Sequence, residues 1–86
     1  MGRFLVEVYL AKGAADDIAA ATARARAAAA DVEDVPVRCL RSIFVPEEET
    51  WFLLYDAPTA AAVREAVERA GLTSALVVEA VAPNFR

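Results

Sequence analysis

The sequence predicts an α+β domain with the element order β-α-β-β-α-β. Four short apolar runs, at residues 3–10, 36–45, 51–55 and 76–81, are typical of strands, and the two stretches between the outer pairs have helical periodicity. Only the polar segment at residues 46–50 separates the two middle runs, which indicates a hairpin. This order predicts a ferredoxin-like fold, in which a four-stranded antiparallel sheet carries both helices on one face.

The first strand is expected at residues 3–10. One of its faces is wholly apolar and should lie beneath the helices, whereas the other face is mixed and carries Glu7. A lysine-glycine pair then ends the strand. The helix that follows is expected to begin near Asp16 and Asp17, because negative charge is favoured at a helix start, and to run to about Ala30.

The second strand is expected at residues 36–45, and the charge of Arg41 decides its register. The alternative register would bury Arg41 unpaired beneath the helices, at a cost of several kcal/mol. The residues turned away from the helices are then Cys39, Arg41, Ile43 and Val45. In the third strand, at residues 51–55, alternation is expected to turn Phe52 and Leu54 towards the helices. The side chains turned away are then Trp51, Leu53 and Tyr55.

The second helix is expected to begin after the N-cap residue Thr59 and to end at Gly71, which suits a left-handed position after the last turn. In the last strand, at residues 76–81, Glu79 is expected to face away from the helices. Right-handed crossovers place the first and third strands in the centre, the fourth beside the first and the second beside the third. Glu7 and Glu79 are therefore expected on neighbouring strands of one face.

The size and charge of the chain limit what it can do. Its 86 residues, 58% of them apolar, allow a single domain over residues 1–86, and so small a domain gains stability from association. Thirteen acidic and nine basic residues, with no basic cluster, argue against nucleic acid or a membrane surface as partner. The start shows no signal peptide, no stretch could span a bilayer, and the lone Cys39 suits a reducing compartment, so a cytoplasmic location is expected.

The sheet face without helices is the predicted functional surface. A face that mixes Glu7, Arg41 and Glu79 with apolar side chains is too apolar to stay open to water, so a partner or ligand should cover it. The candidate ligand-binding residues are Tyr9, Cys39, Arg41, Trp51, Leu53 and Tyr55. Pocket and dimer interface are both open at this point, and in the second case the charges would form salt bridges between subunits.

The catalytic options are narrow because the chain has no histidine. A Cys-His pair, a Ser-His-Asp triad and a His-based zinc site are excluded within one chain. Glu7 and Glu79 remain as a candidate acid and base, which would suit a cofactor-independent isomerase or cyclase acting on a small apolar substrate. Cys39 is expected to line a site or the core rather than to act as a nucleophile. A purely structural oligomerisation module is a third alternative.

Four segments carry a family resemblance: RFLVEVYL, VRCLRSIFVPEEETWFLLYDAP, AAAVREAVERAGL and VVEAVAP. Over about residues 3–83 the chain resembles a family of small bacterial ferredoxin-like domains of unknown function, whose best-described relatives bind nickel. The most specific part is Tyr55–Pro58 with the helix at residues 63–72 that follows.

The resemblance implies a homodimer and, in the metal-binding relatives, histidine ligands near the end of the first strand. Tyr9 and Leu10 occupy that stretch here, and nickel prefers imidazole or thiolate ligands, so no metal ligand and no cofactor are assigned. Residues and resemblance together predict a small homodimeric protein that binds a small ligand on the open sheet face.

Overall fold

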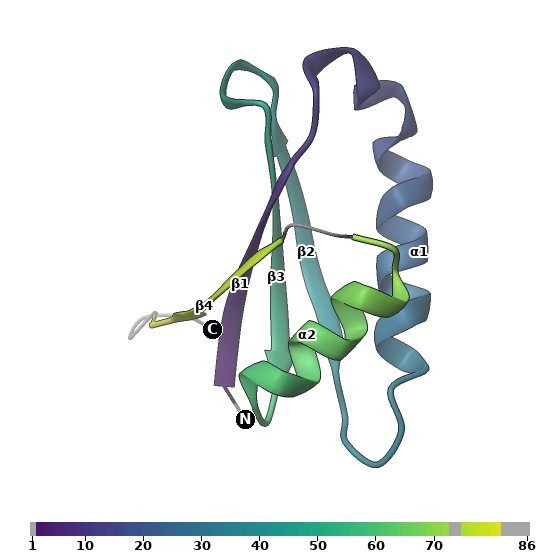
Figure 1. Cartoon of the computed structure of the whole chain (residues 1–86), viewed down its shortest axis with the longest axis vertical. Helices are drawn as coiled ribbons and strands as arrows, with labels where there is room; N and C mark the ends of the chain where they lie inside the picture. Colours follow the sequence, from purple (N-terminus) through teal and green to yellow (C-terminus); the bar gives the residue numbers. More distant parts are fainter. Residues whose placement is uncertain (1, 73–74, 82–86) are drawn as a thin grey trace.

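The computed structural model describes residues 2–72 and 75–81, and it confirms the predicted element order (Figure 1). The strands are β1 (Gly2–Tyr9), β2 (Arg38–Val45), β3 (Thr50–Ala57) and β4 (Leu76–Ala80). The α-helices are α1 (Ile18–Ala30) and α2 (Ala60–Arg69), and two 3-10 helices, η1 (Lys12–Asp17) and η2 (Pro46–Glu48), lie in the connections. All neighbouring strands are antiparallel, in the order β2-β3-β1-β4, so the ferredoxin-like topology is confirmed.

Both helices lie on the same face of the sheet (Figure 1). α1 packs beside α2 and β2, and α2 packs on β3 and β4. The core between the two layers is apolar, because its buried residues include no polar or charged side chain apart from tyrosine and tryptophan. Its largest fully buried side chains are Trp51, Tyr55, Leu53, Val6 and Val63.

The ends of α2 form as the sequence predicts. The Thr59 hydroxyl accepts a hydrogen bond of 3.2 Å from the amide of Ala62, which satisfies a free donor of the first turn. Gly71 has a φ of +78°, a conformation that glycine adopts without strain. The amide of Leu72 then donates to the carbonyl of Val67 at 3.1 Å and closes the helix end.

The start of α1 differs from the prediction. Asp16 lies in η1, and Asp17 stands at the N-cap but makes no side-chain capping bond. Asp17 therefore occupies the N-cap position without a capping hydrogen bond, and only the charge of the two aspartates can favour the helix start. The buried side of α1 consists of small residues, which lets the helix approach the sheet closely.

The expected register of β3 is wrong by one residue. The covered face of β1 carries Phe4, Val6 and Val8, and these residues pair with Tyr55, Leu53 and Trp51. Because residues directly opposite each other share a sheet face, the three β3 residues lie beneath the helices rather than on the open face. The segment from Trp51 to Tyr55 is apolar on both sides, so it offered no charge by which to choose.

Two further placements are corrected. In β2 the pairing shifts between Cys39 and Arg41, and this bulge turns Cys39 to the covered face, where it pairs with Tyr55. In β4, Glu79 pairs with Phe4 and so also lies on the covered side, yet it stays exposed. Glu79 can face the helix side without losing its contact with water, because β4 is an edge strand that α2 covers only in part.

Candidate functional site

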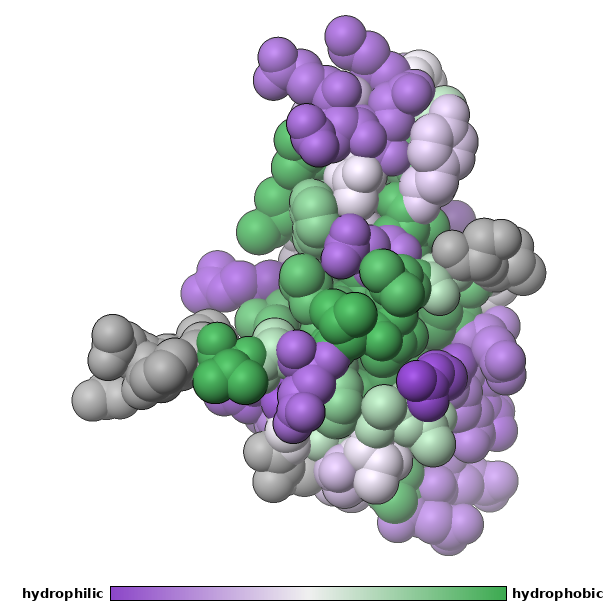
Figure 2. All heavy atoms as spheres, turned by 60° about the vertical axis from the view of Figure 1, so that its left-hand side comes forward, coloured by the Kyte–Doolittle hydropathy of each residue, from purple (hydrophilic) through white to green (hydrophobic). Residues whose placement is uncertain are grey.

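The open face of the sheet is a small lattice of apolar side chains that also carries Glu7 and Arg41 and, at one end, the charged row Arg38-Asp56-Arg3-Ala80. We define the open face as the side of the sheet that bears no helix. Cross-strand pairing from β2 to β4 gives two adjacent rows, Ile43-Phe52-Glu7-Leu76 and Arg41-Leu54-Leu5-Val78. Ile43 and Leu76 are each 56% exposed, which is high for large aliphatic side chains. Figure 2 shows hydrophobic atoms gathered on one side of the molecule with hydrophilic atoms around them.

Glu7 and Arg41 lie on this face as predicted. Glu7 stands between Phe52 and Leu76, and Arg41 stands on the outer strand β2. Neither side chain forms an ion pair or side-chain hydrogen bond within residues 2–72 and 75–81, whereas the nearby Arg3 guanidinium pairs with Asp56 at 2.7 Å. Glu7 and Arg41 are therefore an acid and a base of the open face that no ion pair among the described residues neutralises. Arg38, opposite Asp56 on the same face, likewise forms no ion pair there.

The other predicted site residues lie elsewhere. Trp51, Leu53 and Tyr55 are at most 1% exposed in the core and cannot contact anything on the open face. Glu79 lies on the opposite side of the sheet from Glu7, so the two candidate catalytic carboxylates are not brought together. Tyr9 ends β1 with 70% of its surface exposed.

Cys39 lies in a small cluster with Tyr55 and Arg26 beneath α1. Burial raises the pKa of the Cys39 thiol, and the lowering effects of the Arg26 charge and of Tyr55 are smaller. The thiol lies 3.8 Å from the carbonyl oxygen of Arg41. Because the nucleophile is the thiolate, this environment favours an unreactive, structural cysteine, as the sequence predicted.

A hollow of about 350 Å³ lies at the end of β1, on the helix side. We call it the β1-end hollow. Its lining is mainly apolar, with two charged residues, Asp17 at the end of η1 and Arg24 in the middle of α1. The remaining lining residues are Val8, Tyr9, Leu10, Ala14, Ile18, Ala21, Trp51, Gly71 and Leu72. The structure thus brings together two predicted ligand-binding residues, Tyr9 and Trp51, but in a hollow of the helix layer.

A chain of partly buried hydrogen bonds holds the Trp51 ring in this wall. The indole N–H donates to Ser42 Oγ at 2.6 Å, and Ser42 Oγ lies 2.8 Å from Thr22 Oγ1. Thr22 uses its own proton on the carbonyl of Ile18 at 2.8 Å, so Ser42 must donate to Thr22. The partners of Ser42 are distant in sequence, so these hydrogen bonds connect β2, β3 and α1.

Replacing Ser42 by alanine is expected to lower the free energy of unfolding by about 1–3 kcal/mol, because the buried indole N–H loses its acceptor. Urea unfolding followed by the fluorescence of Trp51, the one tryptophan of the chain, measures the change. Thr22→Val is the control, because it leaves the bond between Trp51 and Ser42 in place and should cost less. An equal or larger loss in Thr22→Val would show that the indole bond is not the important one.

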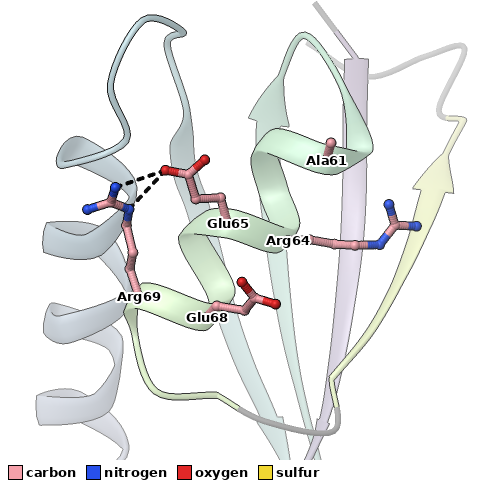
Figure 3. A pocket seen from close by; sticks show the side chains of 5 residues that line it. All are labelled: Ala61, Arg64, Glu65, Glu68 and Arg69. Atoms are coloured by element: carbon pink, nitrogen blue, oxygen red, sulfur yellow. Dashed lines mark hydrogen bonds and ion pairs between the residues drawn. The ribbon is translucent and has the colours of Figure 1, made fainter.

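A second depression, of about 630 Å³ on the outer side of α2, has little that could hold a ligand. Its lining consists of Ala61 and four charged residues of one exposed helix face. Figure 3 shows that Arg69 turns back to Glu65, whereas Arg64 extends towards β4. The ion pair between Glu65 and Arg69, at 3.0 Å, joins residues four apart on one helix face. We regard this surface as a solvated helix face.

Some residues of the site have no clear signal in the sequence. Asp17, at the N-cap of α1, and Arg24, about two turns further along the helix, line the β1-end hollow, but in the sequence they read as helix-start and solvent-facing charges. The β3 register did have a signal. Asp56, one residue beyond the expected strand, shares a face with Leu54, and keeping its carboxylate out of the core selects the observed register.

The donor groups of the described chain do not fit a nickel site. Residues 2–72 and 75–81 contain no cluster of three or more histidine, cysteine or carboxylate residues, and the sequence has no histidine at all. Cys39, the one thiol, lies in the core cluster with a raised pKa.

In the described ranges there is also no helix with the length and apolar character that a membrane span requires.

Comparison with known proteins gives one match. The family model described as "Nickel responsive protein SCO4226-like" matches residues 4–80, which is nearly the whole described chain. No curated protein and no solved structure matches the chain significantly. The match agrees with the resemblance seen in the sequence, including its nickel-associated relatives.

Proposed function

This chain belongs to the nickel responsive protein SCO4226-like family, and we propose that it is a small homodimeric protein that binds a small, mainly apolar ligand in the cytoplasm. The observation that carries the proposal is the β1-end hollow, in which Tyr9 and Trp51 meet. The word "responsive" describes the family, and it does not require nickel to be held by each member.

The β1-end hollow supports ligand binding better than the open face does. Its volume of about 350 Å³ lies in the range of natural small-molecule sites, and its walls combine aliphatic and aromatic side chains with two charges. The Trp51 side chain is held by the bond to Ser42, so this wall is rigid before a ligand arrives. Its place at the end of β1 is also the stretch where the metal-binding relatives are expected to carry histidines.

A ligand other than a bare metal ion suits this hollow. Apolar walls favour a flat or branched hydrocarbon body, and Asp17 and Arg24 favour a polar or charged end group at the mouth. Carboxylate and guanidinium groups alone are poor ligands for nickel. We therefore propose that this member of the family binds an organic molecule rather than a metal ion.

The homodimer is proposed from the open face. Its exposed aliphatic residues form a continuous surface, and a second subunit would remove that surface from water.

The catalytic alternative loses its basis, because Glu7 and Glu79 lie on opposite sides of the sheet. An oligomerisation module without a ligand remains the alternative, and the binding experiment distinguishes the two.

The hollow can be tested with the fluorescent probe 8-anilinonaphthalene-1-sulfonate, which has an aromatic body and one anionic group. We expect saturable binding that quenches Trp51 emission by energy transfer. Ala21→Leu, which fills the hollow from α1, is expected to weaken the affinity at least about tenfold, corresponding to about 1.4 kcal/mol.

The matched control is Ala61→Leu, the same substitution on the outer side of α2. It should leave the affinity for the probe unchanged. Thermal unfolding of both variants verifies that they are folded. Equal affinities in wild type, Ala21→Leu and Ala61→Leu would place the probe outside the hollow, and no saturable binding in the wild type would favour the pure oligomerisation module.

A further inference from the structure

Glu7 and Arg41, two of the three charges of the open face that no described residue neutralises, are arranged so that a second copy of the same face can neutralise both. Glu7 lies on β1 in one apolar row, and Arg41 lies on β2 in the adjacent row, with β3 between them. Strand spacings of about 4.8 Å and a step of about 6.8 Å along the strand put their Cα atoms roughly 12 Å apart. Across this separation the two side chains form no ion pair within residues 2–72 and 75–81.

We propose that two subunits pack open face to open face, with Glu7 of each subunit paired to Arg41 of the partner subunit. The inference rests on the homodimer of the proposed function and specifies its geometry. In a two-fold dimer each contact occurs twice with the roles exchanged, so an acid and a base on one face form two equivalent ion pairs. No other partner is needed to supply the complementary charges.

The apolar side chains agree with this arrangement. A two-fold axis that exchanges the positions of Glu7 and Arg41 passes over β3 between Phe52 and Leu54. These two side chains then lie at the centre of the interface, with an ion pair on each side. Charge therefore meets opposite charge while the interface centre stays apolar, as is usual in protein interfaces.

The same axis sets the angle between the two sheets. Since the line from Glu7 to Arg41 is inclined by about 35° to the direction across the strands, the strands of the two subunits cross at roughly 70°. This lies near the orthogonal class of sheet packing rather than the aligned class. Glu79 does not take part, because it lies on the covered side of the sheet.

Charge reversal tests the reciprocal pairs. Glu7→Arg and Arg41→Glu each create two like-charge contacts per dimer, and each variant alone is expected to raise the dimer dissociation constant roughly tenfold to a hundredfold. An equimolar mixture of the two variants should dimerise like the wild type, because one subunit then carries two arginines and the other two glutamates. Sedimentation velocity over a range of protein concentrations measures all three.

The control is Glu79→Arg, an equal change of charge on the covered side, which should leave the dissociation constant unchanged. If the wild type dimerises but the two reversals have no effect, or their mixture does not recover, the ion pairs are wrong while the homodimer stands. If the wild type is monomeric at every concentration, the homodimer of the proposed function is wrong, and the pairs with it.

Discussion

Replacing Leu53 by alanine is expected to lower the free energy of unfolding by about 2–5 kcal/mol, whereas the same change at the adjacent Leu54 should cost about 1 kcal/mol or less in the monomer. Leu53 is completely buried opposite Val6, and its removal leaves a cavity between sheet and helices. Leu54 is only partly buried on the open face. The pair tests the register of β3 directly, because the two residues differ only in the side they face.

Urea unfolding followed by Trp51 fluorescence gives both values, and low protein concentration keeps subunit contacts from contributing. A small domain has only about 5–15 kcal/mol to lose, so Leu53→Ala can leave the chain largely unfolded. Leu53→Val, with an expected loss of about 1 kcal/mol, then supplies a measurable value. A larger loss at Leu54 than at Leu53 would mean that β3 presents its other side to the helices.

The stability of the fold is expected to fall steeply above about pH 10, with Tyr55 as a main cause. The Tyr55 hydroxyl is buried and has no hydrogen-bond partner among the described residues. Burial raises the pKa of Tyr55 well above its ordinary range, and the neighbouring Cys39 adds a smaller effect in the same direction. Above the ordinary tyrosine pKa of about 10, the unfolded chain releases this proton while the folded chain keeps it. Unfolding is then favoured by about 1.4 kcal/mol for each further pH unit.

Tyr55→Phe removes this dependence and is the matched variant. At neutral pH it should be close to neutral for stability, since the lost hydroxyl has no partner to leave unsatisfied. Urea unfolding of both proteins between pH 7 and pH 11 measures the two slopes. Cys39, whose pKa is also raised, contributes in the same direction from a lower pH, so some loss should persist in the variant. Equal slopes in the two proteins would exclude Tyr55 as the cause.

Charge was a good guide to strand orientation wherever a helix covers the strand completely. Glu7 and Arg41 face away from the helices, as expected, because burying either charge beneath α1 or α2 would cost several kcal/mol. Charge predicted the wrong orientation for Glu79, because the covered side of the edge strand β4 is still accessible to water there. It could have succeeded in β3, had the strand been extended to Asp56.

The functional site was less predictable than the fold. Tyr9 and Trp51 were identified, but their meeting place in the β1-end hollow depends on how η1, α1 and the end of α2 close over the end of β1. The bulge after Cys39 likewise reflects the fit of β2 against β3. Such arrangements depend on packing between segments distant in sequence, which no local pattern encodes.

The sequence by itself determined the element order, the antiparallel sheet with its strand order, and the caps of α2, because hydrophobic periodicity, chain connectivity and single residues such as Thr59 and Gly71 specify these locally. Only the tertiary structure decided which side of β3 enters the core. A strand that is apolar on both sides has two nearly equivalent registers, and the choice between them falls to its neighbours across the sheet.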